Sequence, residues 1–143
     1  MVKLLPGWLP SFDYEYGTPT NLYLADGTFA GICERGIRTG DVKGPALFCL
    51  PLHLQLQALK ELHPSVDVLA ILDDITLHGE ANEVLRAVDS IKVLLTDIGC
   101  TLHDDRGGKN KIFCMDPLAN LETNMTIVSD GIEVVGCPIG KKS

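Results

Sequence analysis

Apolar positions recur at helical spacing in two segments of the chain, and this spacing predicts two helices. Over Glu80–Ile98 the apolar residues fall on one helical face, and Gly99 follows where a helix C-cap is expected. A second helix is predicted over Ala46–Leu62, with leucines near helical spacing despite Pro51 in its second turn. The predicted faces comprise Val84, Val88, Ile91, Leu95 and Ile98 in one helix, and Leu47, Leu50, Leu54, Leu59 and Leu62 in the other.

Short apolar runs bounded by turn residues predict two hairpins in the first half of the chain. Asn21–Ala25 and Thr28–Cys33 flank Asp26-Gly27, a dipeptide that favours a tight turn between strands. Val66–Leu72 is apolar and rich in β-branched residues, and Ile75–Leu77 follows after two aspartates. This order predicts a strand, an acidic turn and an antiparallel return strand.

The two ends of the chain carry weaker patterns. The first 20 residues contain several prolines and glycines, so we expect an irregular lead-in without a helix. After the helix predicted over Glu80–Ile98, Cys100–Leu102 and Lys111–Met115 are candidate strands, and Asp130-Gly131 is expected to join Thr126–Val128 to Ile132–Val135 as a hairpin. These elements predict one α+β domain over residues 1–143, with an antiparallel sheet covered on one face by two helices.

Composition and charge restrict the class of protein. The chain has 143 residues, of which 45% are hydrophobic, and its net charge is −7. No run is long enough to span a membrane, and the N-terminus has no signal-peptide pattern, so we expect an intracellular protein. Five cysteines without a C-x-x-C pair indicate buried thiols in a reducing compartment. The negative charge opposes binding of the isolated chain to nucleic acid.

Two adjacent carboxylates, Asp73 and Asp74, end the apolar strand Val66–Leu72. At the end of a buried strand they would repel each other and lose hydration unless a positive group lies nearby. Mg²⁺ is such a group, because it is often held by one or two carboxylates together with substrate phosphates. A solvated turn is the other interpretation, since aspartate is common in turns.

A glycine-rich loop connects the first hairpin to the first long helix. It has glycine at every fourth position, at Gly36, Gly40 and Gly44, and Pro45 can open the helix that follows. Glycines let a backbone approach a ligand closely, and a helix N-terminus favours anions. The loop has neither P-loop nor Rossmann spacing, so a plain strand-to-helix connection is the alternative.

The order of these features resembles the palm domain of reverse transcriptases (RNA-directed DNA polymerases), above all those of non-LTR retrotransposons. Residues 36–48, GIRTGDVKGPALF, resemble the family's loop G-[VI]-x-Q-G-D-P-x-[SG]-P-x-L-F. Residues 71–74, ILDD, resemble its catalytic turn, an aromatic residue followed by x-Asp-Asp. The segments GCTL at 99–102 and DGIEVVGCPIG at 130–140 resemble later motifs of the palm in the same order.

The chain also departs from the family pattern. Thr39 stands in place of glutamine, Val42 in place of proline, and Ile71 in place of the aromatic residue. The loop that follows Leu102 is longer than usual. The family's first catalytic aspartate would precede Met1, which suggests a fragment with few finger residues and no thumb.

The resemblance implies a site and its ligands. Asp73 would be a metal ligand, with Asp74 assisting it, in a site that holds two Mg²⁺ ions in the intact family. Lys109 would act near the departing pyrophosphate, although Lys111 is a second match and a solvated loop lysine is the alternative. Nucleotide and template would lie against the glycine loop, at Arg38, Thr39, Gly40 and Asp41. The partners would be an RNA or DNA template-primer and deoxynucleoside triphosphates, bound weakly or not at all by this chain alone, and no membrane.

Two other classes of function stay open. The chain could be a non-catalytic remnant or binding module built on the same sheet. It could also be an acidic cation-binding protein with no nucleic-acid role, although no EF-hand loop is present.

Overall fold

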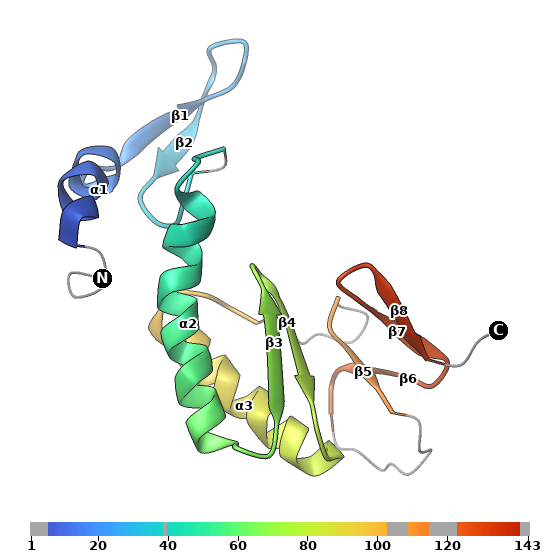
Figure 1. Cartoon of the computed structure of the whole chain (residues 1–143). Helices are drawn as coiled ribbons and strands as arrows, with labels where there is room; N and C mark the ends of the chain where they lie inside the picture. Colours follow the sequence, from blue (N-terminus) through green and yellow to red (C-terminus); the bar gives the residue numbers. More distant parts are fainter. Residues whose placement is uncertain (1–5, 39, 103–108, 115–122, 141–143) are drawn as a thin grey trace. The chain divides into compact units, whose positions relative to one another are not determined.

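The computed structural model describes residues 6–38, 40–102, 109–114 and 123–140. The chain divides into two compact units, Met1–Pro51 and Leu52–Ser143, which are described separately (Figure 1). Helices and strands are mixed in an α+β fold, as the sequence predicts. The expectation of a single domain stays a prediction, since helix α2 (Gly44–Leu62) contributes residues to both units.

The described part of the first unit starts with helical structure at Pro6, so the expectation of an irregular lead-in is wrong. A 3₁₀ turn, η1 (Pro6–Trp8), leads into helix α1 (Leu9–Tyr16). Pro10 lies in the first turn of α1, where backbone N–H groups have no acceptor within the helix, so the missing N–H group costs no hydrogen bond. The rings of Phe12 and Tyr16 stack one turn apart with centroids 5.3 Å apart, which stabilises the short helix.

The hairpin predicted around Asp26-Gly27 is confirmed. Strands β1 (Thr20–Tyr23) and β2 (Phe29–Cys33) pair antiparallel. Asp26 accepts a hydrogen bond from the Thr28 N–H at 2.9 Å, and Gly27 has a φ of +85° that suits glycine.

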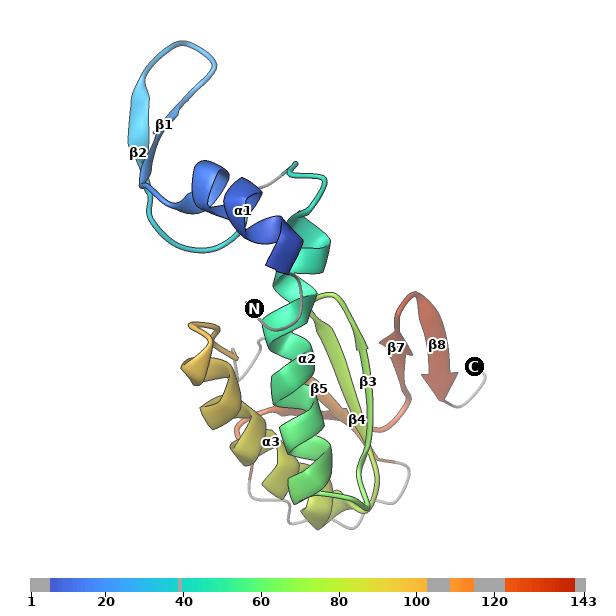
Figure 2. The same cartoon turned by 60° about the vertical axis from the view of Figure 1, so that its left-hand side comes forward.

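The second unit is built around the second half of α2, helix α3 (Ala81–Asp97) and the hairpin of β3 (Asp67–Ile71) and β4 (Asp74–His78). Figures 1 and 2 show both helices running beside this hairpin, and α3 contacts β4. The side chain of Glu80 caps α3 by accepting hydrogen bonds from the N–H groups of Asn82 and Glu83. His63, after α2, hydrogen-bonds Ser90 of α3 at 2.8 Å and ties the two helices together.

The core of the second unit comes mainly from the predicted helical faces. Four residues of α3 are buried, and they include three of the five predicted apolar positions. In α2 the prediction is partly wrong: Leu54 and Leu62 are exposed, whereas Leu52 is buried with Leu59, two turns further along the same side. Among the described residues of this unit, the buried side chains are Leu52, Leu59, Val66, Ala87, Val88, Ile91 and Leu95.

Within the described residues the strands form four two-stranded sheets instead of one antiparallel sheet. Strand β5 (Lys111–Phe113) pairs parallel with β6 (Thr126–Val128), and β7 (Gly131–Val134) pairs antiparallel with β8 (Cys137–Gly140). Residues Cys100–Leu102 form no strand, so that expectation is wrong.

The predicted turn at Asp130-Gly131 is also wrong. The tight turn lies instead at Val135-Gly136, where φ is 50° and 78°, as in a type I′ turn. Gly131 serves close pairing, because a Cβ there would come within 2.8 Å of the Ile139 carbonyl oxygen.

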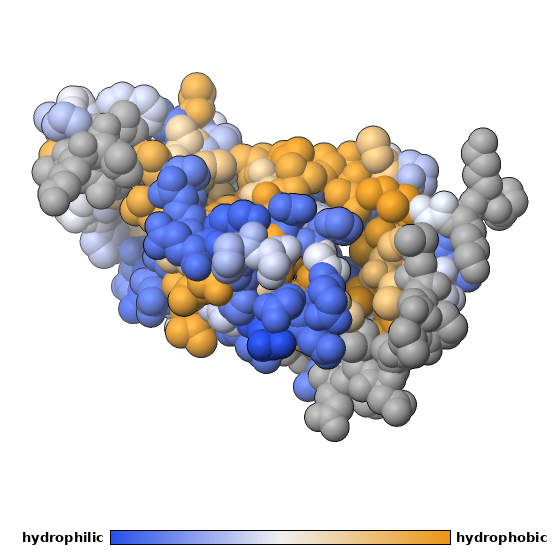
Figure 3. Space-filling view, turned by 60° about the horizontal axis from the view of Figure 1, so that its bottom comes forward, coloured by the Kyte–Doolittle hydropathy of each residue, from blue (hydrophilic) through white to orange (hydrophobic). Residues whose placement is uncertain are grey.

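Apolar side chains also reach the surface, as the orange regions of Figure 3 show. Leu69 and Ile71 of β3 are exposed, and so is Leu72 in the turn that follows. All five cysteines are free, but four are only partly buried and Cys137 is exposed, so the expectation of buried thiols is wrong. Among the described helices, none is long and apolar enough to cross a membrane.

Candidate functional site

The two predicted metal ligands lie at the turn of the β3–β4 hairpin. The register pairs Ile71 with Asp74, which leaves Leu72 and Asp73 as a two-residue loop. Asp73 therefore occupies the turn itself, and Asp74 is the first residue of β4. The predicted antiparallel pairing around the two aspartates is confirmed.

The backbone at this turn is unusual for its sequence. Leu72 has a φ of 55°, in the left-handed region that non-glycine residues seldom adopt. This conformation costs about 1–2 kcal/mol in a residue with a Cβ. The turn therefore adopts a strained geometry at the position that directly precedes the two carboxylates.

Both carboxylates face solvent. Asp73 and Asp74 are exposed, and Asp74 shares a sheet face with its cross-strand partner Ile71. Val68 and Ala70 are partly buried and occupy the opposite face of β3. The expectation of a buried strand end is wrong for this reason: water hydrates the two acids, and their mutual repulsion is screened.

The hairpin offers a cation oxygen ligands but not a full set. In the part of the chain that the structure describes, no lysine, arginine or histidine forms an ion pair with Asp73 or Asp74. Over the same residues, no group of three or more acidic, histidine or cysteine side chains lies together. Two carboxylates suit a hard cation such as Mg²⁺ that takes its other ligands from water and substrate.

Lys109, the predicted pyrophosphate residue, lies exposed two positions before β5. It belongs to the same unit as the aspartates. Within the described residues no hydrogen bond or ion pair links Lys109 to Asp73 or Asp74. Its role stays a prediction.

The glycine loop belongs to the first unit. Gly36 and Gly40 have φ of 84° and 88°, which explains why glycine occurs at both positions. Gly44 begins α2, and a Cβ there would come within 2.8 Å of the Ile37 side chain. Of the predicted nucleotide- and template-binding residues, Arg38, Gly40 and Asp41 are described, whereas Thr39 lies outside the described residues.

The charged side chains of this loop contact α1. Arg38 donates hydrogen bonds to the Glu15 carbonyl oxygen and, at 2.6 Å, to the Thr20 hydroxyl. Its guanidinium also lies 5.2 Å from the centroid of the Tyr16 ring, within range of a cation–π interaction. Arg38 is thus oriented by a carbonyl, a hydroxyl and an aromatic face, all from residues before the loop.

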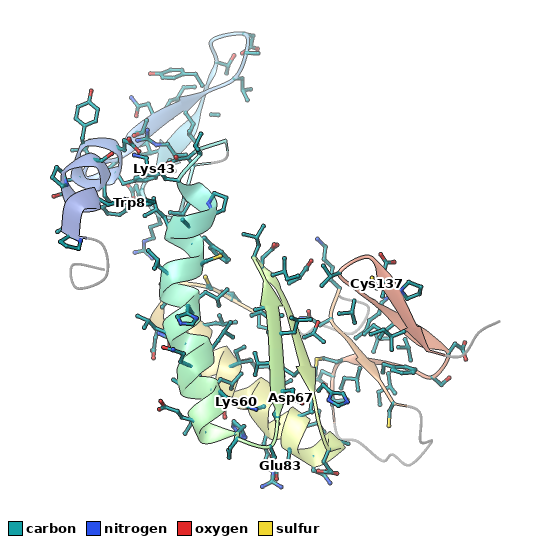
Figure 4. The ribbon with its side chains drawn as sticks, in the orientation of Figure 1. Trp8, Lys43, Lys60, Asp67, Glu83 and Cys137 are labelled. Atoms are coloured by element: carbon teal, nitrogen blue, oxygen red, sulfur yellow. The ribbon has the colours of Figure 1, made fainter. Side chains whose placement is uncertain are left out.

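Asp41 and Lys43 complete these contacts. The Asp41 carboxylate accepts hydrogen bonds from the Tyr16 hydroxyl and, at 2.8 Å, from the Lys43 N–H. Lys43, labelled in Figure 4 where the loop enters α2, forms an ion pair of 2.6 Å with Glu15. It also donates to the Ser11 hydroxyl at 2.6 Å.

Two pKa values in this network move apart. The hydrogen bond from Tyr16, followed by the one from the Lys43 N–H, lowers the pKa of Asp41 below its ordinary value. The same bond to Asp41 raises the pKa of Tyr16 above 10.0. At neutral pH the pair is therefore a neutral phenol that donates to an ionised carboxylate.

Sequence analysis missed the residues before the loop that bind it, namely Ser11, Glu15, Tyr16 and Thr20. The prolines and glycines of their segment predict irregular structure, which conceals a helix. The signal present in the sequence is the pair Ser11 and Glu15, because positions four apart share a helical face.

Comparison of the chain with models of known protein families gives no match. Comparisons with curated proteins and with solved structures give no match either.

Proposed function

We propose that this chain is part of the palm of an RNA-directed DNA polymerase of the non-LTR retrotransposon type, and that it carries one of the carboxylate segments of the polymerase site. One observation carries the proposal. The β3–β4 hairpin presents Asp73 and Asp74 to solvent at a two-residue turn, with a helix on either side of the hairpin in the sequence. This arrangement agrees with the motif order on which the resemblance rests.

Mg²⁺ is the cofactor that this proposal requires. The residues fit it in kind, because exposed carboxylate oxygens are its preferred protein ligands and it keeps open positions for phosphate oxygens. Asp73 would be the principal ligand and Asp74 the second. Bound there, Mg²⁺ would neutralise charge on the phosphates during nucleotidyl transfer.

The remaining roles are assigned to the chain's own residues. Asp73 and Asp74 would position the phosphate-bearing substrate by way of the metal. Arg38, Thr39, Gly40 and Asp41 would form the nucleotide and template side, where the contacts described above fix Arg38 and Asp41. Lys109, or Lys111, would lie near the departing pyrophosphate as an exposed cation. The partners of the intact polymerase would be an RNA or DNA template-primer and a deoxynucleoside triphosphate, bound weakly or not at all by this chain alone.

Titration calorimetry with Mg²⁺ and with Mn²⁺ tests the metal site. We expect weak binding, because two carboxylates and water make a poor site, and weaker binding still for Asp73→Asn. Asp97→Asn is the matched control: it removes the same charge from an exposed position at the end of α3. Equal loss of binding in the two variants would refute a specific role for Asp73.

Primer extension on an RNA template tests the activity of the chain. We expect no incorporation by the 143-residue chain, because two adjacent carboxylates do not complete a two-metal site. Incorporation that Asp73→Asn abolishes would show that another acid completes the site. Asp26 and Asp41 already accept internal hydrogen bonds, which makes Asp13 the first candidate to replace.

The same experiments separate the alternatives. An acidic cation-binding protein would bind Mg²⁺ equally well with and without a nucleoside triphosphate, and would lose affinity in Asp97→Asn as much as in Asp73→Asn. A non-catalytic binding module would bind nucleic acid without metal and would be insensitive to Asp73→Asn.

A further inference from the structure

The glycine loop turns the side chains of Arg38, Asp41 and Lys43 toward the preceding segment, whereas Gly40 and the Val42 side chain are exposed. Arg38, Asp41 and Lys43 all bond to residues of α1 or to Thr20. Val42, between Asp41 and Lys43, is 95% exposed, and Gly40 is exposed as well. The loop therefore has an anchored side, formed by Arg38, Asp41 and Lys43, and a free side, formed by Gly40 and Val42.

The contacts to α1 are of several kinds and involve residues from both of its turns. Ser11 and Glu15 are one turn apart and both accept hydrogen bonds from the Lys43 ammonium group. Tyr16 contributes both its hydroxyl, to Asp41, and its ring, to Arg38. A plain strand-to-helix connection would not require these side-chain contacts. Backbone hydrogen bonds within the loop, such as the one from the Gly44 N–H to the Asp41 carbonyl oxygen at 3.0 Å, would suffice to form its turn.

We propose that α1 is a clamp that fixes the conformation of the glycine loop, and that Tyr16 is its positioning residue. Tyr16 joins the two loop residues of opposite charge, because it donates to Asp41 and lies against the Arg38 guanidinium. Asp41 in turn accepts the Lys43 N–H, which holds the entry into α2. The clamp sets the backbone around Gly40 before any ligand arrives, which lowers the entropic cost of binding.

Only the identity of the ligand that binds the loop rests on the proposed function; the clamp itself does not. If the loop faces the nucleotide, its free side would receive a phosphate-bearing ligand on the backbone near Gly40, with Arg38 held beneath as an oriented cation. Arg38 and Asp41 are then positioning residues of the site. Their contacts with the segment before the loop also explain why the loop contains charged residues that do not point to solvent.

Hydrogen exchange of the full chain, measured by mass spectrometry without metal or nucleotide, tests the clamp. Tyr16→Phe removes the hydroxyl and keeps the ring, so we expect exchange of the Lys43 and Gly44 amides to become at least about threefold faster. Tyr14→Phe is the matched control, because Tyr14 lies on the same helix and is 89% exposed. We expect no change in that variant.

A second variant keeps the charge and changes the geometry. Arg38→Lys loses the planar group that reaches both the Glu15 carbonyl and the Thr20 hydroxyl, so we expect faster loop exchange, with Arg35→Lys as the exposed control. Unchanged loop exchange in both Tyr16→Phe and Arg38→Lys would overturn the clamp. Equally accelerated exchange in α3 would overturn it too, because the effect would then be global.

Addition of dATP with Mg²⁺ separates the clamp from the function. Protection of the wild-type loop that Tyr16→Phe weakens would support both. Absence of protection in a wild-type loop that still responds to Tyr16→Phe would count against the nucleotide side of the proposed function and would leave the clamp established.

Discussion

Replacing Leu59 with alanine tests whether the second unit is held by the core that the helical patterns define. Leu59 has no exposed surface, and it lies in α2 two turns beyond Leu52, which is also buried. Truncation removes the transfer free energy of the lost carbons and leaves a cavity among packed neighbours. For a fully buried leucine these two terms together cost about 3 kcal/mol.

That loss is large compared with the stability of a domain, which is roughly 5–15 kcal/mol. It corresponds to a fall in the melting temperature of roughly 10 °C for a chain of this size. Thermal and urea unfolding, followed by far-ultraviolet circular dichroism, measure it. We expect a lower midpoint with an unchanged urea slope, because the surface exposed on unfolding hardly changes.

Leu62→Ala is the control, because the same chemical change is made in the same helix at a side chain that is 62% exposed. We expect a change within about 0.5 kcal/mol, as for most surface substitutions. Equal destabilisation by the two substitutions would refute the assignment of Leu59 to the core. It would show that α2 is stabilised by something other than the face shared by Leu52 and Leu59.

Three further results are expected. Val88→Asp should unfold the second unit in a thermal melt, because an unpaired buried charge costs several kcal/mol, whereas Val93→Asp on the exposed side of α3 should not. Val135→Asn should stabilise the β7–β8 hairpin toward urea by about 1 kcal/mol, because asparagine tolerates the left-handed conformation of that position better than valine. The hydrogen bond between Tyr16 and Asp41 should contribute less to stability at both ends of the pH scale. Its contribution falls in acid as Asp41 is protonated through its lowered pKa, and in base as Tyr16 ionises through a pKa raised above 10.0. Hydrogen exchange of the loop and tyrosinate absorbance measure the two changes.

The elements that sequence analysis predicted well are those whose signals are local. The β3–β4 hairpin and α3 lie within one or two residues of their predicted bounds, because the apolar run, the helical period and the glycine that follows the helix all act within a few residues. The sequence pattern did not predict that Asp73 and Asp74 are exposed, because their exposure depends on which elements pack against β3.

The rest depends on contacts between distant residues. Four separate sheets, including the parallel pair of β5 and β6, cannot be read from strand patterns alone. Gly131 and Gly136 are both glycines beside apolar runs, and only the pairing of β7 with β8 shows that the first serves close approach and the second a turn. The contacts between α1 and the glycine loop were not predicted, because Pro10 indicates irregular structure when only the sequence is considered. In the structure Pro10 lies in the first turn of α1.

Under the proposed function, the turn of the β3–β4 hairpin is a metal-binding segment of a polymerase palm. Nuclear magnetic resonance of the chain with a small amount of Mn²⁺ tests it most directly, because the paramagnetic ion broadens the amide signals nearest to it. We expect broadening centred on Leu72, Asp73 and Asp74, enhanced by a deoxynucleoside triphosphate and lost in Asp73→Asn but kept in Asp97→Asn. Broadening centred on other residues, or unchanged in Asp73→Asn, would contradict it.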